Sequence, residues 1–169
     1  MSNVNQNICI YCGFCCDGTL FNHARIKENE QIATNFSFEI IEKEKRSFKQ
    51  PCPYYINNIC VIYAERPYAV CESFQCKLLK ALGTGIISFD GAMKNIDDVT
   101  GLKTKIENQL FKYHPENKGD SLTAKMKEFN SHFKGTMSEA EFRKKYGKMV
   151  LDYFILNEIL DNKFKSKPL

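Results

Sequence analysis

Cysteine is the residue type in this sequence with the greatest capacity for chemistry, and it is concentrated in one part of the chain. Residues 9–16 read CIYCGFCC, so half of these positions carry thiols. All the cysteines lie before residue 77: Cys9, Cys12, Cys15, Cys16, Cys52, Cys60, Cys71 and Cys76. Thiols at this density indicate a disulfide framework, a metal site or a redox-reactive centre.

Length and composition weigh against the disulfide framework. A chain of 169 residues with 43% hydrophobic residues can bury a core without disulfide cross-links. Its first residues, MSNVNQN, lack the apolar run of a secretory signal, and no segment approaches the ~20 apolar residues that cross a bilayer. We therefore expect a cytoplasmic protein with reduced thiols and no membrane partner, a setting in which dense cysteine favours metal binding or catalysis.

The spacing of the first three cysteines is typical of metal ligands. The C-x2-C-x2-C pattern of Cys9, Cys12 and Cys15 lets successive thiolates wrap around one centre. It begins the iron–sulfur runs of ferredoxins, and C-x2-C alone also begins zinc knuckles. The ferredoxin run continues with three residues and Cys-Pro, which this sequence lacks, so the spacing excludes a two-cluster ferredoxin.

Adjacent cysteines carry geometric information. Cys15 and Cys16 would point to opposite sides of a strand, or about 100° apart on a helix, so they rarely reach one metal together. Cys71 and Cys76 would stand about 140° apart on one regular helix. The eight thiols divide naturally into two sets of four, which fits two zinc sites, a zinc site plus an iron–sulfur cluster, or two clusters.

Neighbouring residues add alternatives that the spacing leaves open. Because free cysteine is common in protein cores, Cys60 and Cys76 are the candidates for simple packing. His23 is an alternative ligand near the cysteine cluster. The basic residues close to the cysteines in sequence could offset thiolate charge: Arg66, Lys77 and Lys80.

Three segments together resemble a known family. CIYCGFCC, PCPYY (residues 51–55) and CVIYAERPYAVCESFQC (residues 60–76) are similar, in order and in their non-cysteine residues, to the YkgJ-type cysteine-cluster proteins. The resemblance covers roughly residues 8–82 and implies a CxxCxxCC domain whose cysteines chelate zinc or iron, a 4Fe–4S cluster included. Here Glu72 and Gln75 stand where that family often has a basic residue and a proline.

Beside the resemblance, the residues of the Arg66-Pro67 segment themselves predict roles near the ligands. Tyr63 would pack near the centre, and Arg66 could hydrogen-bond carbonyls or thiolates from outside the ligand set. A related domain occurs in flagellin lysine N-methylase. The hypotheses are thus a zinc- or iron-binding protein without an assigned role, an iron–sulfur enzyme in protein methylation or redox chemistry, and a zinc-stapled protein-interaction module. No catalytic residue can be named, so the sequence does not decide whether the chain is an enzyme.

Charge indicates little about partners. The net charge of +4 arises in residues 117–169, where it fits the solvated faces of helices. Nucleic-acid binding would need a stronger basic stripe with interleaved aromatics. A metal ion is therefore the partner that the sequence predicts, and any protein partner is unidentified.

The sequence signals for the helices and strands that must position the cysteines predict an α+β fold that is mostly helical. We expect a cysteine-rich region over 1–83, irregular with a β-hairpin around a metal centre, and a helical extension over 84–169 that packs on it, one domain overall. In the first region, the alternating apolar residues from Phe36 to Ile40 predict a strand that turns back at 43–46. Asn57-Asn58 predicts a second turn, and Pro67 begins a helix that ends near Leu82.

Three helices are expected in the second region. They are expected to begin at Ser88, at Asp120 or Ser121, and at the capping box of Ser138 and Glu141. We expect His114-Pro115 to end the first, and the last to end near Leu160 before a frayed tail. The aromatic residues of the last helix are predicted to lie in the core, with a partner groove as the alternative: Phe142, Tyr146, Tyr153 and Phe154.

Overall fold

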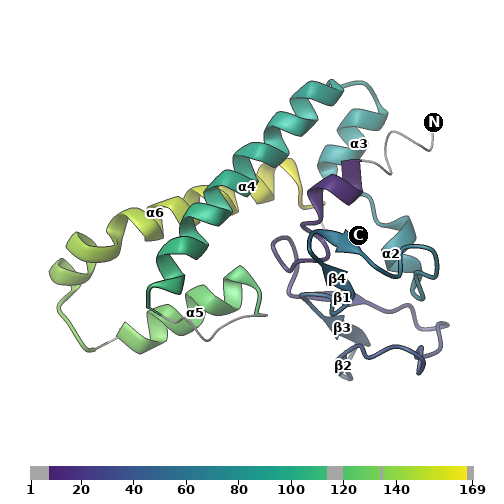
Figure 1. Ribbon diagram of the computed structural model, residues 1–169, viewed down its shortest axis with the longest axis horizontal. Coiled ribbons are helices and arrows are strands. Elements are labelled where there is room, and N and C mark those ends of the chain that lie inside the picture. The colour runs from purple at the N-terminus through teal and green to yellow at the C-terminus, as the bar shows by residue number, and fades with distance from the viewer. Residues whose placement is uncertain (1–7, 114–119, 134, 167–169) are drawn as a thin grey trace.

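The computed structural model describes residues 8–113, 120–133 and 135–166. The fold is α+β, as predicted, and about 51% helical. Figure 1 shows two parts, a group of short strands and loops beside an arrangement of long crossing helices. Among the described residues, none of the helices is both long enough and apolar enough to cross a membrane.

Two small antiparallel sheets form the strand part. In the first, β3 (Ser47–Lys49) lies between β1 (His23–Arg25) and β2 (Ile40–Ile41). The predicted hairpin across 43–46 is therefore confirmed, although only Ile40 and Ile41 of its first strand pair with β3. The edge strand β1 has no alternating pattern and was not predicted.

The second sheet is a two-residue hairpin of β4 (Tyr55–Ile56) and β5 (Ile59–Cys60). Asn57 and Asn58 form its turn with φ values of 50° and 62°. Asparagine tolerates this left-handed conformation, which matches the twist of the paired strands. The turn predicted from the asparagine pair is confirmed, and it fixes the position of Cys60.

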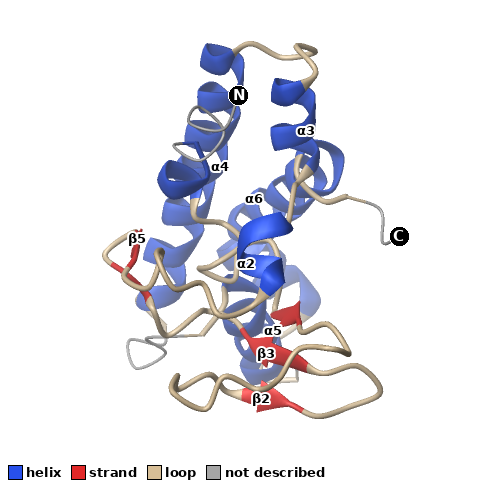
Figure 2. Cartoon of the chain, turned by 90° about the vertical axis from the view of Figure 1, so that its right-hand side faces the viewer, coloured by secondary structure: helices blue, strands red, loops and turns tan. Residues whose placement is uncertain are grey.

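The predicted helix over 67–82 is wrong as one element, because the chain forms two. These are α2 (Ala69–Ser73) and α3 (Lys77–Gly83), separated where Phe74 is extended with ψ 128°. The Sγ atom of Cys76 then accepts a hydrogen bond from the Leu79 N–H at 3.4 Å and caps α3. Cys71 lies in α2 and Cys76 at the start of α3, so neither is bound by the angle that a continuous helix would impose. Figure 2 shows α2 and α3 as separate helices.

Three longer helices complete the fold: α4 (Phe89–Phe111), α5 (Leu122–Phe133) and α6 (Glu139–Lys163). The predicted starts are confirmed, since Ser88 accepts from the Gly91 N–H and Ser138 forms a capping box with Glu141. The Ser121 hydroxyl accepts from the Ala124 N–H at 3.2 Å. The stop expected at His114-Pro115 lies outside the described residues, and α4 ends at Phe111.

One hydrophobic core joins the two parts. Apolar residues of α4, α5 and α6 pack in the same buried cluster as Phe14 and Leu20 of the cysteine-rich segment. The prediction of a frayed tail after Leu160 is wrong for Phe164, which is fully buried. Its ring centroid lies 5.5 Å from that of Phe14. Tyr146 is core as predicted, whereas Phe154 is 61% exposed and was wrongly placed there.

Candidate metal centre

The CIYCGFCC segment reverses direction between its second and third cysteines. Residues 8–12 form a short helical turn that ends at Gly13, whose φ is +63°. The Gly13 N–H donates to the Cys9 carbonyl at 3.0 Å, and the Cys16 N–H donates to the Gly13 carbonyl at 2.8 Å. A Cβ on Gly13 would overlap the hydroxyl of Tyr55, so glycine is required here for both backbone conformation and space.

Backbone hydrogen bonds bring distant cysteines to this turn. The Cys52 N–H donates to the Cys16 carbonyl at 2.7 Å, and the Tyr55 N–H donates to the Cys52 carbonyl at 3.0 Å. Tyr55 pairs with Cys60 across the β4–β5 hairpin. Cys16, Cys52 and Cys60 are therefore brought together by main-chain contacts, although long stretches of sequence separate them.

The electrostatic interactions among the thiols fall into two groups of four. Beyond the effect of burial, a charge on Cys76 raises the pKa of Cys9, Cys12 and Cys15. Charges on Cys52, Cys60 and Cys71 raise that of Cys16 in the same way. We call Cys9, Cys12, Cys15 and Cys76 the first thiol group, and Cys16, Cys52, Cys60 and Cys71 the second thiol group.

The adjacent pair Cys15-Cys16 is divided between the two groups, and so is the pair Cys71 and Cys76. A charge on Cys16 also raises the pKa of Cys15, less than charges on Cys12 and Cys76 do but more than a charge on Cys9 does. The two groups therefore lie side by side and meet at Cys15-Cys16.

Burial holds the thiols in their neutral form. Loss of solvent, followed by the neighbouring thiols, raises the pKa of Cys9 and Cys71 to about 11 and that of Cys16 to about 12. The same causes also raise the pKa of Cys12 and Cys15 above the usual range of a thiol. Near neutral pH, these sulfur atoms lose their protons only if a cation compensates the charge.

Opposing this, backbone N–H groups point at several sulfur atoms. The N–H of Phe14 lowers the pKa of Cys12, and those of Leu79 and Leu78 lower that of Cys76, although burial outweighs them in both cases. Tyr54 and Tyr55 act in the same way on Cys52, and Tyr68 on Cys71. Hydrogen bonds to sulfur favour the thiolate over the thiol, so the environment suits bound thiolates better than free ones.

The three basic residues near the cysteines take different positions. A charge on Lys80 lowers the pKa of Cys76, although burial dominates that thiol. The Lys77 ammonium instead donates to the Asp161 carbonyl at 2.6 Å. The Arg66 guanidinium lies 4.4 Å from the Tyr63 ring centroid and 3.4 Å from a Glu72 carboxylate oxygen, so Glu72 acts as its partner. His23 is exposed on β1, opposite Lys49.

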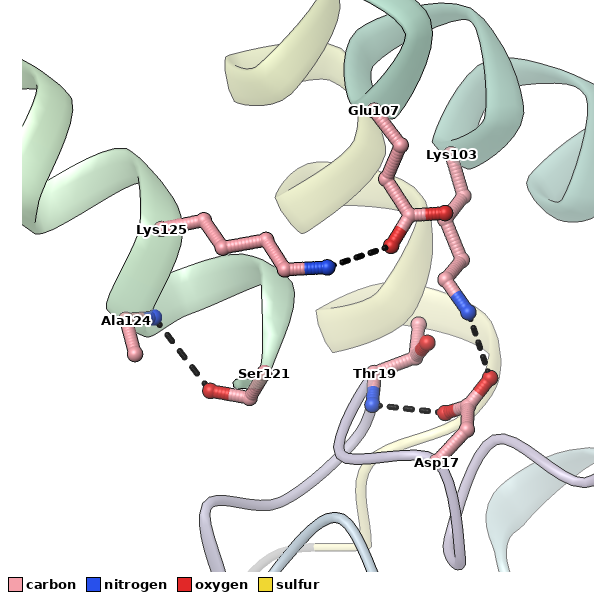
Figure 3. A network of polar contacts seen from close by, with 7 residues as sticks. All are labelled: Asp17, Thr19, Lys103, Glu107, Ser121, Ala124 and Lys125. Atoms are coloured by element: carbon pink, nitrogen blue, oxygen red, sulfur yellow. Dashed lines mark hydrogen bonds and ion pairs between the residues drawn. The ribbon is translucent and has the colours of Figure 1, made fainter. Parts of the chain in front are cut away.

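Two carboxylates that the sequence did not single out support the cysteine segments. Glu30 accepts from the Ala69 N–H at 2.6 Å and so satisfies the start of α2, which carries Cys71. Asp17, next to Cys16, accepts from the Thr19 N–H at 2.8 Å and from the Lys103 ammonium at 2.6 Å (Figure 3). Asp17 could have been suggested by its position, but the Lys103 partner on α4 has no signal in the sequence.

The thiol groups are not closed around a centre. Within residues 8–113, 120–133 and 135–166, no three or more Cys, His, Asp or Glu side chains stand in an arrangement that could already hold a metal ion. Four thiolates do fit Zn²⁺ or an iron centre, because both prefer tetrahedral sulfur coordination.

Comparison with known proteins gives a match to a family model. The family model CxxCxxCC, with the description "Putative zinc- or iron-chelating domain", matches residues 8–98, slightly more than half of the chain. This range contains all eight cysteines. No curated protein and no solved structure matches the chain.

Proposed function

Because the chain belongs to the CxxCxxCC family of zinc- or iron-chelating domains, we propose that it binds two zinc or iron centres, one in each thiol group. Each centre would take four thiolate ligands, three of the first from the CIYCGFCC segment and three of the second from residues 52–71. The observation that carries the proposal is the division of the eight thiols into two groups of four.

The surroundings of the thiols support this assignment. Four thiolates around Zn²⁺ leave a net charge of −2, which the N–H donors at Cys12, Cys76, Cys52 and Cys71 would help to balance. Lys80 would add a full positive charge beside the first thiol group. These donors come from four separate segments, so metal binding would hold those segments in one arrangement.

The donor set favours some roles over others. A tetrahedral centre with four protein ligands has no open position for substrate, which favours a structural role or electron transfer over hydrolysis at the metal. Bound zinc would serve as a structural staple, as in the interaction-module hypothesis. Bound iron–sulfur clusters would supply one-electron chemistry, as in the redox-enzyme hypothesis.

Anaerobic purification followed by elemental analysis separates these alternatives. Colourless protein with two equivalents of zinc supports the structural role. Brown protein with a broad absorption band near ~400 nm, bleached reversibly by a reductant, supports iron–sulfur clusters and electron transfer. A chain prepared in the presence of both metals that carries neither, with every thiol alkylated in the native state, contradicts the proposal.

The adjacent cysteines provide a matched pair of variants for the division into two centres. We expect Cys15→Ser and Cys16→Ser each to halve the bound metal, and the double variant to lose it. Alkylation followed by peptide mass spectrometry would then find Cys9, Cys12 and Cys76 reactive in Cys15→Ser, with Cys52, Cys60 and Cys71 protected. Cys16→Ser would give the reverse, and loss of protection at all six sites in both variants would contradict two separate centres.

A further inference from the structure

The outer face of α6 carries apolar side chains that stay substantially exposed in the described structure. Leu151 is 57% exposed, Phe154 61% and Ile155 40%, and they lie at helical spacings of three and four. The opposite face supplies Tyr146, Met149 and Leu156 to the core. We call Leu151, Phe154, Ile155 and Gly147 the outer stripe.

Gly147 has no role in the packing of the described chain that would require glycine. A Cβ built on it meets nothing within 4 Å, and its backbone is ordinary helix. Glycine in the middle of a helix is unfavourable relative to alanine, because it has more conformational freedom to lose. A residue without a side chain does allow a second helix to approach closely at this point.

Charges of opposite sign lie at the two ends of the outer stripe. Lys144 precedes Leu151 by seven residues and Glu158 follows it by seven, which places both within about 20° of Leu151 around the helix axis. Both residues are exposed, and no ion pair joins either to another residue in the described parts of the chain. Lys148 adds a second positive charge near Lys144.

This order is complementary to itself when reversed. In an antiparallel pair of α6 helices centred on Leu151, Lys144 of each copy faces Glu158 of the other. Gly147 and Ile155 lie four residues on either side of Leu151, so each Ile155 faces the space left by the other Gly147. A two-fold axis near Leu151 thus pairs each Lys144 with a Glu158 and places each Ile155 beside the other copy's Gly147. Both copies use the same surface, as in an isologous interface.

We propose that the outer stripe of α6 binds a second copy of this chain, forming an antiparallel two-fold dimer centred on Leu151. An anionic membrane surface fits less well, because it would attract Lys144 and Lys148 but repel Glu158 at the other end of the same face. The proposal does not depend on the metal centres, which lie on other segments.

Sedimentation equilibrium of the metal-loaded chain over a wide concentration range tests the dimer. We expect the mass to rise to twice that of the chain, and Leu151→Lys to abolish this rise. Ile86→Lys changes a residue that is 82% exposed outside α6 and should leave dimerisation unchanged. A wild-type chain that is monomeric at every concentration overturns the proposal, as does a dimer that Leu151→Lys does not affect.

Charge reversal tests the antiparallel register. Lys144→Glu and Glu158→Lys should each raise the dissociation constant about tenfold, since each affects two ion pairs in a symmetric dimer. The double variant exchanges the charges and should restore the wild-type dissociation constant. Failure of the double variant to recover, with wild-type circular dichroism and metal content, contradicts the register.

Two helix glycines provide the remaining control. Gly147→Gln should raise the dissociation constant by at least about tenfold, because the new side chain fills the space proposed for Ile155. Gly101→Gln makes the same change at an equally open glycine of α4 and should leave dimerisation unchanged. Equal effects of the two substitutions on the dissociation constant contradict the proposal. The proposal is also contradicted if the monomer binds anionic vesicles and Leu151→Lys abolishes that binding.

Discussion

The cysteine side chains experience two opposing influences at the scale of single residues. Burial raises the pKa of Cys9, Cys12, Cys15, Cys16, Cys52, Cys71 and Cys76, and neighbouring thiols add to this at all of them except Cys76. Backbone N–H groups directed at Cys12, Cys52, Cys71 and Cys76 lower the pKa instead. Without a cation, burial dominates and these seven thiols are neutral near pH 7. A bound cation adds the attraction that the thiolates need, so metal binding must release protons.

The raised pKa values predict how pH affects the metal-free protein. A thiol whose folded-state pKa exceeds its unfolded value contributes stability below that unfolded value and loses it as pH rises through the folded one. For Cys16 this loss of stability extends from about pH 9 to about pH 12. We therefore expect the free energy of unfolding of the reduced protein, freed of metal by a chelator, to fall as pH rises above 9.

Denaturant unfolding of wild type and Cys16→Ser over this pH range measures the effect, because lysines and tyrosines titrate equally in both. The wild type should lose stability more steeply than the variant. Metal affinity should change in the opposite direction and increase with pH, since fewer protons need to be displaced. Parallel stability curves for the two chains would show that burial of Cys16 does not favour its neutral form.

At the scale of elements, one ion pair connects the CIYCGFCC segment to the long helix behind it. Lys103 of α4 and Asp17 have side chains only 18% and 16% exposed, with their charged atoms 2.6 Å apart. A second pair, Lys125 of α5 with Glu107 of α4 at 3.5 Å, lies beside it (Figure 3). The loop that carries Cys15 and Cys16 is therefore positioned by α4 and by the local backbone together.

Removal of the Lys103 charge should lower the stability of the fold more than removal of an exposed lysine charge on the same helix. We expect Lys103→Met to lower the free energy of unfolding by about 2 kcal/mol, because it leaves the Asp17 carboxylate in a largely buried site without its cation. Lys94 pairs with Asp98 on α4, where the side chains are 73% and 50% exposed. Lys94→Met should change the stability by less than about 0.5 kcal/mol.

Denaturant unfolding of the metal-loaded variants compares the two costs. Metal content of Lys103→Met should be measured in parallel, since a displaced Asp17 would also disturb the adjacent Cys16. Equal destabilisation by the two substitutions would show that the Asp17 contact does not hold the loop.

The whole molecule has a main apolar core and a smaller second apolar cluster. Most residues of the main core come from α4, α5 and α6, so we expect these helices to hold together without metal. The cysteine-rich segment contributes fewer buried apolar residues, with Ile26, Phe48 and Tyr68 forming its own small cluster. We infer that residues 1–83 depend on metal more than residues 84–169 do.

Hydrogen exchange with and without a chelator tests this difference. Metal removal should increase exchange by at least about 100-fold at backbone amides within residues 13–61. Amides of α4 and α6 near Ile96, Val99 and Leu156 should stay protected, since those side chains are at most 1% exposed. Protection should return when the removed metal is added back. Uniform loss of protection would mean that the helices also need the metal, and no loss would mean that metal does not order the cysteine-rich segment.

Local sequence signals determined the elements whose formation depends on a few neighbouring residues. The caps at Ser88, Ser121 and Ser138 predicted helix starts, and Asn57-Asn58 predicted a turn, because each satisfies backbone geometry within its own segment. The sequence also predicts that Cys15 and Cys16 do not share one metal, since neighbouring side chains point in different directions.

Only the tertiary structure decided which distant residues meet. The association of Cys76 with Cys9, Cys12 and Cys15 depends on the break between α2 and α3 and on how α3 packs, and neither leaves a periodic signal. Burial of Phe164 against Phe14 and exposure of Phe154 were mispredicted for the same reason. Helical periodicity ranks the faces of one helix, but which face is covered depends on every other element that packs around it.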